Sequence, residues 1–236
     1  GTYKEQQKNI QKIAKSIASI VLGKHLYKIS AITHGNGPQV GNILIQQEYT
    51  KKVPKLPMHT AVAMTQGQIG YMLQQALQNE FKKLKKDRKI VSLITQTVVA
   101  KKKSKLVQSS PSKPIGPYFT ELEVKKLRKD TNQIFRRVKP AGVKTWRRVV
   151  PSPKPLEIVE VDILKQFAED SCLLIAGGGG GIPVIKNGSG FVGVNCVIDK
   201  DHSASLLAKS IKASVLLLLT DIDKVKLNYG KSDESD

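Results

Sequence analysis

Hydrophobic positions along the chain alternate between the spacing of helices and that of strands. Over residues 4–22 the apolar side chains recur at helical spacing between Lys and Gln, and Gly23 suits the C-terminal cap of a helix. Residues 26–33 are rich in apolar and β-branched side chains, which predicts a buried strand. Residues 61–84 predict a second long helix, and residues 89–99 predict a second strand rich in Val, Ile and Thr.

This alternation stops over residues 100–155 and then returns. The interruption contains many prolines, many charges and the single tryptophan, which predicts an excursion from the core sheet in the form of a small lid. The elements predicted after it are a helix at 161–169, a strand at 172–176, a hairpin through 186–190, a helix at 203–211 and a strand at 215–219. Strands and helices in this order predict an α/β fold whose mainly parallel sheet is covered by helices on both faces.

Composition narrows the class of protein. A chain of 236 residues with 40% hydrophobic content can bury a large core, in one large domain or two small ones. The longest apolar run has the length of a strand, so we expect no membrane span. Cys172 and Cys196 lie among apolar residues, which predicts buried thiols in a reducing compartment. His and Cys show no metal-ligand spacing, so we expect any metal ion to arrive with the substrate.

The formal net charge of +20 would attract polyanions or phosphorylated small molecules. The Lys and Arg residues gather in short runs without interleaved aromatic residues, and aromatic residues make up only 5% of the chain. Because nucleic-acid surfaces usually add stacking platforms to their charge, we predict a solvated basic face and no specific nucleic-acid partner. Nonspecific polyanion binding is the alternative that charge alone leaves open.

Glycine-rich or acidic loops follow three of the predicted strands, at residues 34–41, 177–181 and 220–223. Ligands of open α/β sheets bind outside the carboxyl ends of the strands, so these loops should meet at one rim. Residues 177–181 are five consecutive glycines, which are costly to order and indicate a close approach to the backbone. An anionic phosphate is the natural candidate for that approach.

The spacing of the glycine and charged residues bears on two kinds of phosphate site, one for dinucleotide binding and one for phosphoryl transfer. Gly35, Gly37 and Gly41 are similar to a dinucleotide-binding turn, but the spacing differs and no acidic residue follows about twenty positions later. The cluster of Asp199, Lys200 and Asp201 suits phosphoryl transfer, although such a cluster can also be a solvated turn. The sequence has neither a Walker loop nor the catalytic loop of protein kinases, so a kinase here would belong to another class.

Six ordered stretches resemble one family over essentially the whole chain. They are HGNGPQVGN at 34–42, AMTQGQIGY at 63–71, KPIGP at 113–117, WRRVVPSPKP at 146–155, GGGGIPV at 178–184 and VIDKD at 197–201. Together they resemble bacterial carbamate kinase, a member of the amino-acid kinase superfamily.

The resemblance implies a three-layer αβα sandwich around a mainly parallel sheet. It implies one domain over residues 1–236, with residues 100–155 as a protruding lid subdomain and without the family's first strand and C-terminal part. It further implies a cytoplasmic homodimer that transfers a phosphoryl group reversibly between carbamoyl phosphate with ADP and carbamate with ATP. That reaction belongs to arginine fermentation by the deiminase pathway, and Mg²⁺ accompanies the nucleotide.

The resemblance also assigns the site residues. Lys200, Asp201 and Lys113 are the expected catalytic residues: Lys200 stabilises charge on the transferred group, Asp201 orients lysines or metal, and Lys113 reaches in from the lid. The expected substrate and phosphate contacts are His34, Gly35, Asn36, Gly37, Gly178, Gly179, Gly180 and Gly181. The expected nucleotide contacts are Thr220, Asp221 and Tyr229. No residue is expected to bind a metal directly.

Two alternatives to an active carbamate kinase remain. One is another small-acid kinase of the superfamily, which the stretches PQVG and KPIGP disfavour. The other is a truncated or degenerate homologue that binds nucleotide without catalysing the reaction.

Overall fold

The computed structural model describes residues 2–23, 29–50, 52–101, 111–130, 133–170, 172–219 and 227. Its helices are α1 (Tyr3–Leu22), α2 (Gly37–Tyr49), α3 (Met58–Lys83), α5 (Glu121–Asp130), α6 (Val161–Glu169), the short 3₁₀ helix η1 (Gly178–Gly180) and α7 (Lys200–Ser210). Its strands are β1 (Ala31–Ile32), β2 (Ile90–Ser92), β3 (Gln96–Val98), β4 (Lys113–Phe119), β5 (Ile134–Arg137), β6 (Trp146–Val150), β7 (Glu157–Ile158), β8 (Leu173–Ile175), β9 (Ile182–Asn187) and β10 (Gly190–Gly193).

Two sheets form the body of the protein. Residues 90–98 and residues 173–187 each supply one strand to the first sheet and one to the second. The first sheet is parallel, with the order β1-β8-β2. The second has the order β10-β9-β3-β7, in which β3 and β9 are parallel and the outer pairs are antiparallel. The connection from β8 to β9 is longer than the facing connection from β2 to β3, and the excess forms the glycine turn.

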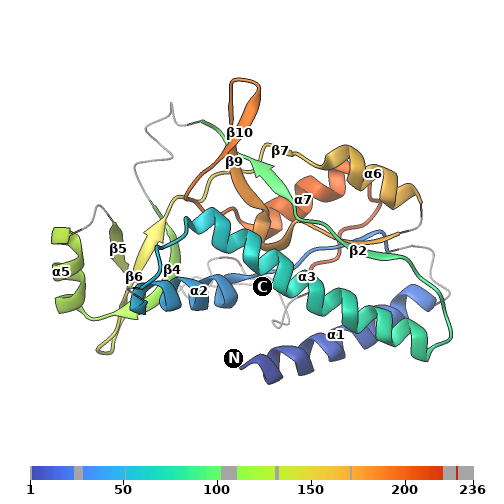
Figure 1. Ribbon diagram of the computed structural model, residues 1–236, viewed down its shortest axis with the longest axis horizontal. Coiled ribbons are helices and arrows are strands. Elements are labelled where there is room, and N and C mark those ends of the chain that lie inside the picture. Colours follow the sequence, from blue (N-terminus) through green and yellow to red (C-terminus); the bar gives the residue numbers. More distant parts are fainter. Residues whose placement is uncertain are drawn as a thin grey trace.

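Strand β8 lies at the centre of the layered structure because its side chains alternate between two cores. Leu173 and Ile175 pack with α1, α3 and β2. Leu174 packs on the opposite face, in the core formed with α6, α7 and β7. All three side chains are almost fully buried, so period-two alternation on one strand joins two helical layers to the sheet between them. This arrangement is the expected three-layer αβα sandwich, with helices on both sides of the strands (Figure 1).

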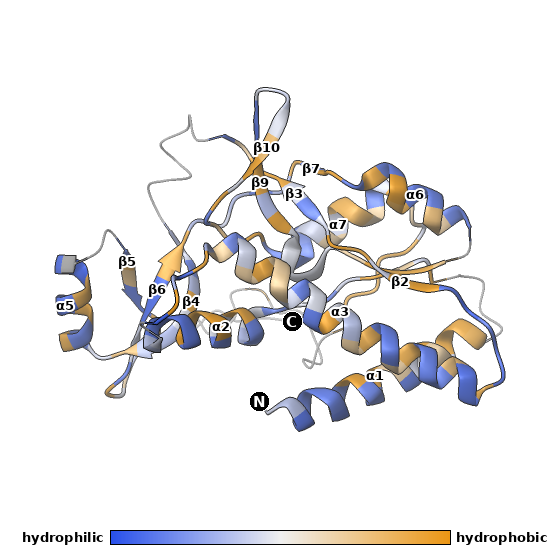
Figure 2. Cartoon of the chain, viewed as in Figure 1, coloured by the Kyte–Doolittle hydropathy of each residue, from blue (hydrophilic) through white to orange (hydrophobic). Residues whose placement is uncertain are grey.

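Local signals explain the outer helices well. Helix α1 begins with a capping box between Thr2 and Glu5, and the amide of Gly23 closes its last turn on the carbonyls of Ser19 and Ile20. Its outer side is hydrophilic, whereas β2 is strongly hydrophobic (Figure 2). The predicted helix over residues 4–22 is therefore confirmed, as are the helix at 161–169 and the hairpin through 186–190.

The described part of residues 100–155 forms a separate antiparallel sheet of order β4-β6-β5, accompanied by α5. These elements gather at one end of the molecule, away from the helices α1, α6 and α7 (Figure 1). Basic side chains cover its aromatic rings: Arg128 lies over Trp146, and Lys139 and Arg147 lie over Tyr118. We call this unit, residues 111–150, the protruding subdomain.

Three predicted strands differ from the structure. Residues 89–99 form two short strands, because the chain breaks its pairing at residues 93–95 where it faces the glycine turn. Only the end of the strand predicted at 26–33 is seen, as β1, and residues 24–28 lie outside the described residues. The strand predicted at 215–219 is wrong: these residues form no strand, and 42–71% of the surface of each residue is exposed. Apolar, β-prone sequence makes a strand only where a neighbouring strand supplies hydrogen bonds.

Both cysteines are buried thiols, as predicted. Among the described residues, no helix combines the length and apolar character that crossing a membrane requires.

Candidate active site

The glycine turn after β8 is buried, and its backbone requires glycine. Gly177, Gly179, Gly180 and Gly181 all have positive φ, between 65° and 91°. A Cβ atom on Gly179 would lie 2.1 Å from the Asn36 side chain. A Cβ atom would also collide with the His34 ring at Gly178, the Ile198 carbonyl at Gly180 and Thr97 at Gly181, at 2.4, 2.7 and 1.9 Å. The glycines therefore let neighbouring protein segments approach closely.

The backbone amides of this turn are mostly occupied by protein oxygens. Gly179 donates to the carbonyl of His34 at 2.7 Å, and Gly177 donates to Thr95 Oγ1 at 3.0 Å. Gly180 and Gly181 donate within the turn, to Gly177 and Gly178. The turn thus supports the loop at residues 34–36 through hydrogen bonds. Direct phosphate binding by the amides of the turn stays a prediction.

His34 rests on this turn in a defined protonation state. Its Nδ1 lies 3.0 Å from the carbonyl oxygen of Gly35, which can only accept, so Nδ1 carries the proton. Burial lowers the pKa of His34 below its ordinary value, while the hydrogen bond to Gly35 partly offsets that effect. The neutral ring therefore keeps an unprotonated Nε2 beside the glycine turn, within 2.4 Å of the position that a Cβ of Gly178 would occupy.

Asn36 directs the entry into α2. It occupies the N-cap position but makes no capping hydrogen bond; instead its side chain donates to Thr65 Oγ1 at 2.9 Å in the buried interior. The helix then begins at Gly37 with Pro38 in its first turn, as predicted. Because no side chain caps this helix end, its first amides and its positive dipole are available to an anion.

The first turn of α7 meets the loop before α2. A Cβ on Gly35 would lie 3.6 Å from Cδ of Lys200, so the lysine stem passes beside this exposed glycine. Lys200 and Asp201 are both exposed. Within the part of the chain that the structure describes, no ion pair or hydrogen bond engages the Lys200 ammonium group, which leaves it available to a ligand.

Asp199 and Lys113 join this site from different parts of the fold. Asp199 is the N-cap of α7, and its Oδ1 accepts the amides of Asp201 and His202 at 3.0 and 3.4 Å. Its Oδ2 accepts the ammonium of Lys113, the first residue of β4, at 3.0 Å. The structure therefore brings the expected lid lysine to the helix end that carries Lys200.

Gln66 is a structural member of the site to which the sequence analysis gave no role. Its side chain is buried and forms a clamp: Oε1 accepts the amide of Thr95 at 2.8 Å, and Nε2 donates to the carbonyls of Thr95 and Gly178 at 3.1 and 3.0 Å. It thus fastens α3 to the strand break and to the glycine turn. The sequence signal that could have indicated this role is a glutamine on the apolar face of the helix predicted at 61–84.

Comparison with known proteins identifies the family. The family model described as "Amino acid kinase family" matches residues 1–235. The chain belongs to the amino acid kinase family. The carbamate kinase of Thermococcus kodakarensis is 44% identical over 99% of this chain and 73% of its own length. That of Oenococcus oeni is 40% identical over 97% of this chain and 72% of its own length.

Solved structures of this family agree with the fold. The carbamate kinase from Giardia lamblia bound to AMP-PNP superposes with a TM-score of 0.85 and 41% sequence identity, over all of this chain and 72% of that structure. The relatives of this amino acid kinase are therefore carbamate kinases, and the family expected from the six stretches is confirmed.

The expected site residues of this amino acid kinase divide into those that the structure describes and those that it does not. Thr220, Asp221 and Tyr229 lie outside the described residues. The described residues that are expected to be catalytic or to contact phosphate do come together: Lys113 binds the N-cap of α7, the stem of Lys200 lies beside Gly35, and the loop at 34–37 is hydrogen-bonded to the glycine turn.

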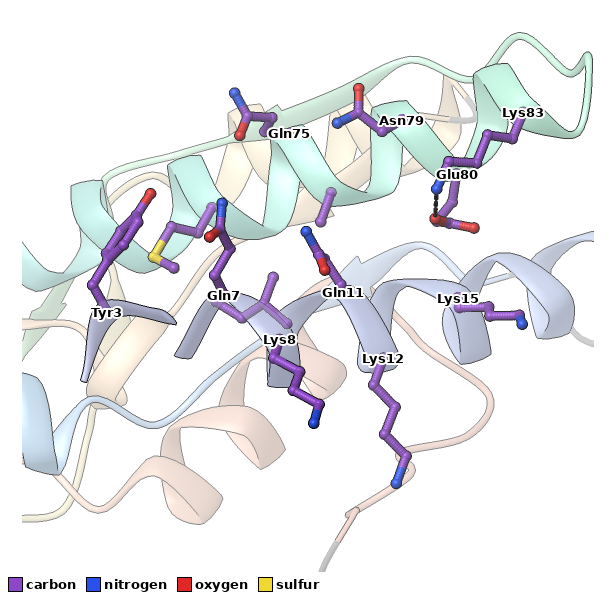
Figure 3. Close-up of a pocket in the computed structure, with 13 residues that line it drawn as sticks. Tyr3, Gln7, Lys8, Gln11, Lys12, Lys15, Gln75, Asn79, Glu80 and Lys83 are labelled. Carbon is purple, nitrogen blue, oxygen red and sulfur yellow. Dashed lines mark hydrogen bonds and ion pairs between the residues drawn. The ribbon is translucent and has the colours of Figure 1, made fainter. Parts of the chain in front are cut away.

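A groove of about 450 Å³ lies elsewhere, between α1 and α3. Gln7 and Gln11 point from α1 toward α3, whereas the ammonium ends of Lys8 and Lys12 point away (Figure 3). None of the expected site residues that the structure describes lines this groove.

Proposed function

We propose that this chain is a carbamate kinase, which transfers a phosphoryl group reversibly between carbamoyl phosphate and ADP. One observation carries the proposal: the stem of Lys200 passes beside Gly35, so two helix N-termini and the Lys200 ammonium group meet at one place. Positive helix ends and lysines are what a transferring phosphoryl group requires, since its equatorial oxygens carry the negative charge.

The reaction needs no general base. In the direction that forms ATP, a terminal oxygen of the β-phosphate of ADP attacks the phosphorus of carbamoyl phosphate. The bond from phosphorus to the carbamoyl oxygen breaks, and carbamate leaves as an anion with the bonding electrons. In reverse, the anionic oxygen of carbamate attacks the γ-phosphorus of ATP. The protein has to hold the two anions in line and to neutralise their charge.

The residues divide this work between them. Lys200 stabilises the charge that develops on the transferred phosphoryl group, and Lys113 reaches the same group from the protruding subdomain. Asp201 orients these cations. The open N-terminus of α2 at Gly37, with Gly35 and Asn36 before it, receives substrate oxygens, and His34 and the glycine turn at Gly178–Gly180 support that loop from below.

Mg²⁺ enters with the nucleotide. Among the described residues no group of three or more His, Cys, Asp or Glu side chains lies close enough to hold a metal ion. The phosphates of the nucleotide would supply most of the ligands of this ion.

The cellular setting follows from the family resemblance and from the thiols. Two buried cysteine thiols support a reducing compartment such as the cytoplasm. We assign the reaction to the arginine deiminase pathway and expect a homodimer, which light scattering of the purified protein would test.

A coupled assay tests the activity. Carbamoyl phosphate and MgADP are supplied, and the ATP formed is read through hexokinase and glucose-6-phosphate dehydrogenase. The proposal predicts ATP in proportion to enzyme concentration. Binding of MgADP by calorimetry without any ATP formation would favour a nucleotide-binding homologue that lacks catalysis.

A further inference from the structure

One carboxylate, that of Asp199, connects the protruding subdomain to the helix that carries Lys200. Lys113 and Asp199 are 86 positions apart in sequence, yet Lys113 Nζ lies 3.0 Å from Asp199 Oδ2. The other oxygen of the same carboxylate caps α7 by accepting the amides of Asp201 and His202. Both oxygens therefore have separate partners, and each oxygen is held in place by the other's bonds.

We propose that Asp199 is a positioning residue, a latch that holds the Lys113 ammonium group beside Lys200 before substrate binds. The inference rests on the proposed function, in which Lys113 and Lys200 bind the same transferred phosphoryl group. It differs from a surface ion pair in its geometry: the acceptor is rigidly fixed by a helix cap, and the donor starts the first strand of the protruding subdomain.

The electrostatics of the cap fit this role. Burial would raise the pKa of Asp199, but the hydrogen bond from Lys113 and the two amide bonds outweigh burial, so the pKa lies below its ordinary value. The carboxylate is therefore ionised at neutral pH. The side chains of Lys113 and Asp199 remain 40% and 33% exposed, so solvent and ligands can reach the pair.

The latch also explains how Lys113 can serve a substrate. An ammonium group has three donors, and Asp199 uses one of them. An incoming phosphoryl oxygen can therefore bind Lys113 while the lysine stays on the latch. Without Asp199, the lysine would have to be ordered anew in each catalytic cycle, which costs side-chain entropy.

A double-mutant cycle tests the latch through turnover. Asp199→Asn keeps a good N-cap residue but removes the charge that attracts Lys113. We expect it to lower kcat by roughly fivefold or more and to leave KM for ADP within about twofold. In the Lys113→Met background it should cause no further loss. An unchanged kcat in Asp199→Asn, or an equal loss in both backgrounds, would overturn the proposal.

Glu121→Gln is the matched control. It breaks the ion pair between Lys125 and Glu121, which has a similar length of 3.2 Å but lies within α5 of the same subdomain. We expect its kcat and KM to equal those of the unaltered protein, which would show that loss of a subdomain ion pair alone does not slow the reaction.

A second readout is independent of turnover. Carbon-13 NMR of the Asp199 carboxyl should show a pKa that rises when Lys113 is replaced by Met. If that pKa rises and the protein still forms no ATP, the latch stands and the proposed function fails. If the pKa is the same in both proteins, the latch is wrong whatever the activity.

Discussion

The backbone amide of Gly179 donates to the carbonyl oxygen of His34 at 2.7 Å, and this bond ties the turn after β8 to the loop before α2. The two segments are far apart in the sequence, but both follow parallel strands that pair in one sheet, β8 and β1. The bond fixes the position, relative to the glycine turn, of the loop that leads to Gly35 and to the uncapped N-terminus of α2. The geometry of the site thus depends on the glycine turn even where the turn itself contacts no ligand.

Gly180→Ala tests the packing of that turn. Its φ of +91° and the Ile198 carbonyl, 2.7 Å from the new Cβ, both oppose a side chain. We expect the free energy of unfolding in urea to fall by about 3 kcal/mol or more. Gly188→Ala is the control, because φ is +59° there and nothing lies within 4 Å of its Cβ position. It should cost only about 1 kcal/mol, and equal losses in both variants would contradict the steric argument.

Gln66→Leu tests the clamp between α3 and the glycine turn. The replacement has a similar volume but leaves the Thr95 amide and the Gly178 carbonyl without their buried partner. We expect a loss of roughly 2–4 kcal/mol in urea unfolding. Gln75→Leu, on the exposed side of the same helix, should change stability by less than about 0.5 kcal/mol. A neutral effect of Gln66→Leu would show that the clamp does not hold the turn.

The lowered pKa of His34 predicts how the free energy of unfolding depends on pH. Burial lowers its pKa in the folded protein below the ordinary 6.5, so the unfolded chain takes up a proton first as the pH falls. The stability associated with the neutral ring is complete above pH 6.5 and declines as the pH falls from there through the lower folded-state pKa. His34→Gln should remove this decline.

The measurement is urea unfolding of both proteins at pH 8 and at pH 5.5. The unaltered protein should lose more stability between the two values than His34→Gln does. An identical loss in both proteins would mean that His34 is protonated as easily in the folded protein as in the unfolded chain.

Local signals in the sequence predicted most of the helices, while contacts between distant segments decided the rest. The apolar period and the cap of α1 are contained within the helix, so its bounds were predictable. Helix α7 begins at Lys200, earlier than the predicted residue 203, because the Asp199 cap supplies its first hydrogen bonds. The strand predicted at 215–219 had the right composition but has no paired neighbour among the described residues.

The candidate site was predictable as a set of residues but not as a set of contacts. Glycine spacing and the charges at 199–201 pointed to phosphate chemistry, and the resemblance added Lys113. The ion pair of Lys113 with Asp199 could not be read from the sequence, since it depends on how β4 and α7 meet. The same holds for Gln66, whose three backbone contacts come from Thr95 in the strand break and from Gly178 in the glycine turn.

Phosphorus-31 NMR of carbamoyl phosphate and MgADP with the protein tests the central claim most directly, since it separates transfer from hydrolysis. We predict that the signal of carbamoyl phosphate is replaced by the γ-phosphate signal of ATP. Lys200→Ala should slow this change by roughly a hundred- to a thousandfold. Lys209→Ala, at the exposed far end of the same helix, should leave the rate within about twofold. Formation of inorganic phosphate alone, or equal rates with and without the Lys200 ammonium group, would contradict the account.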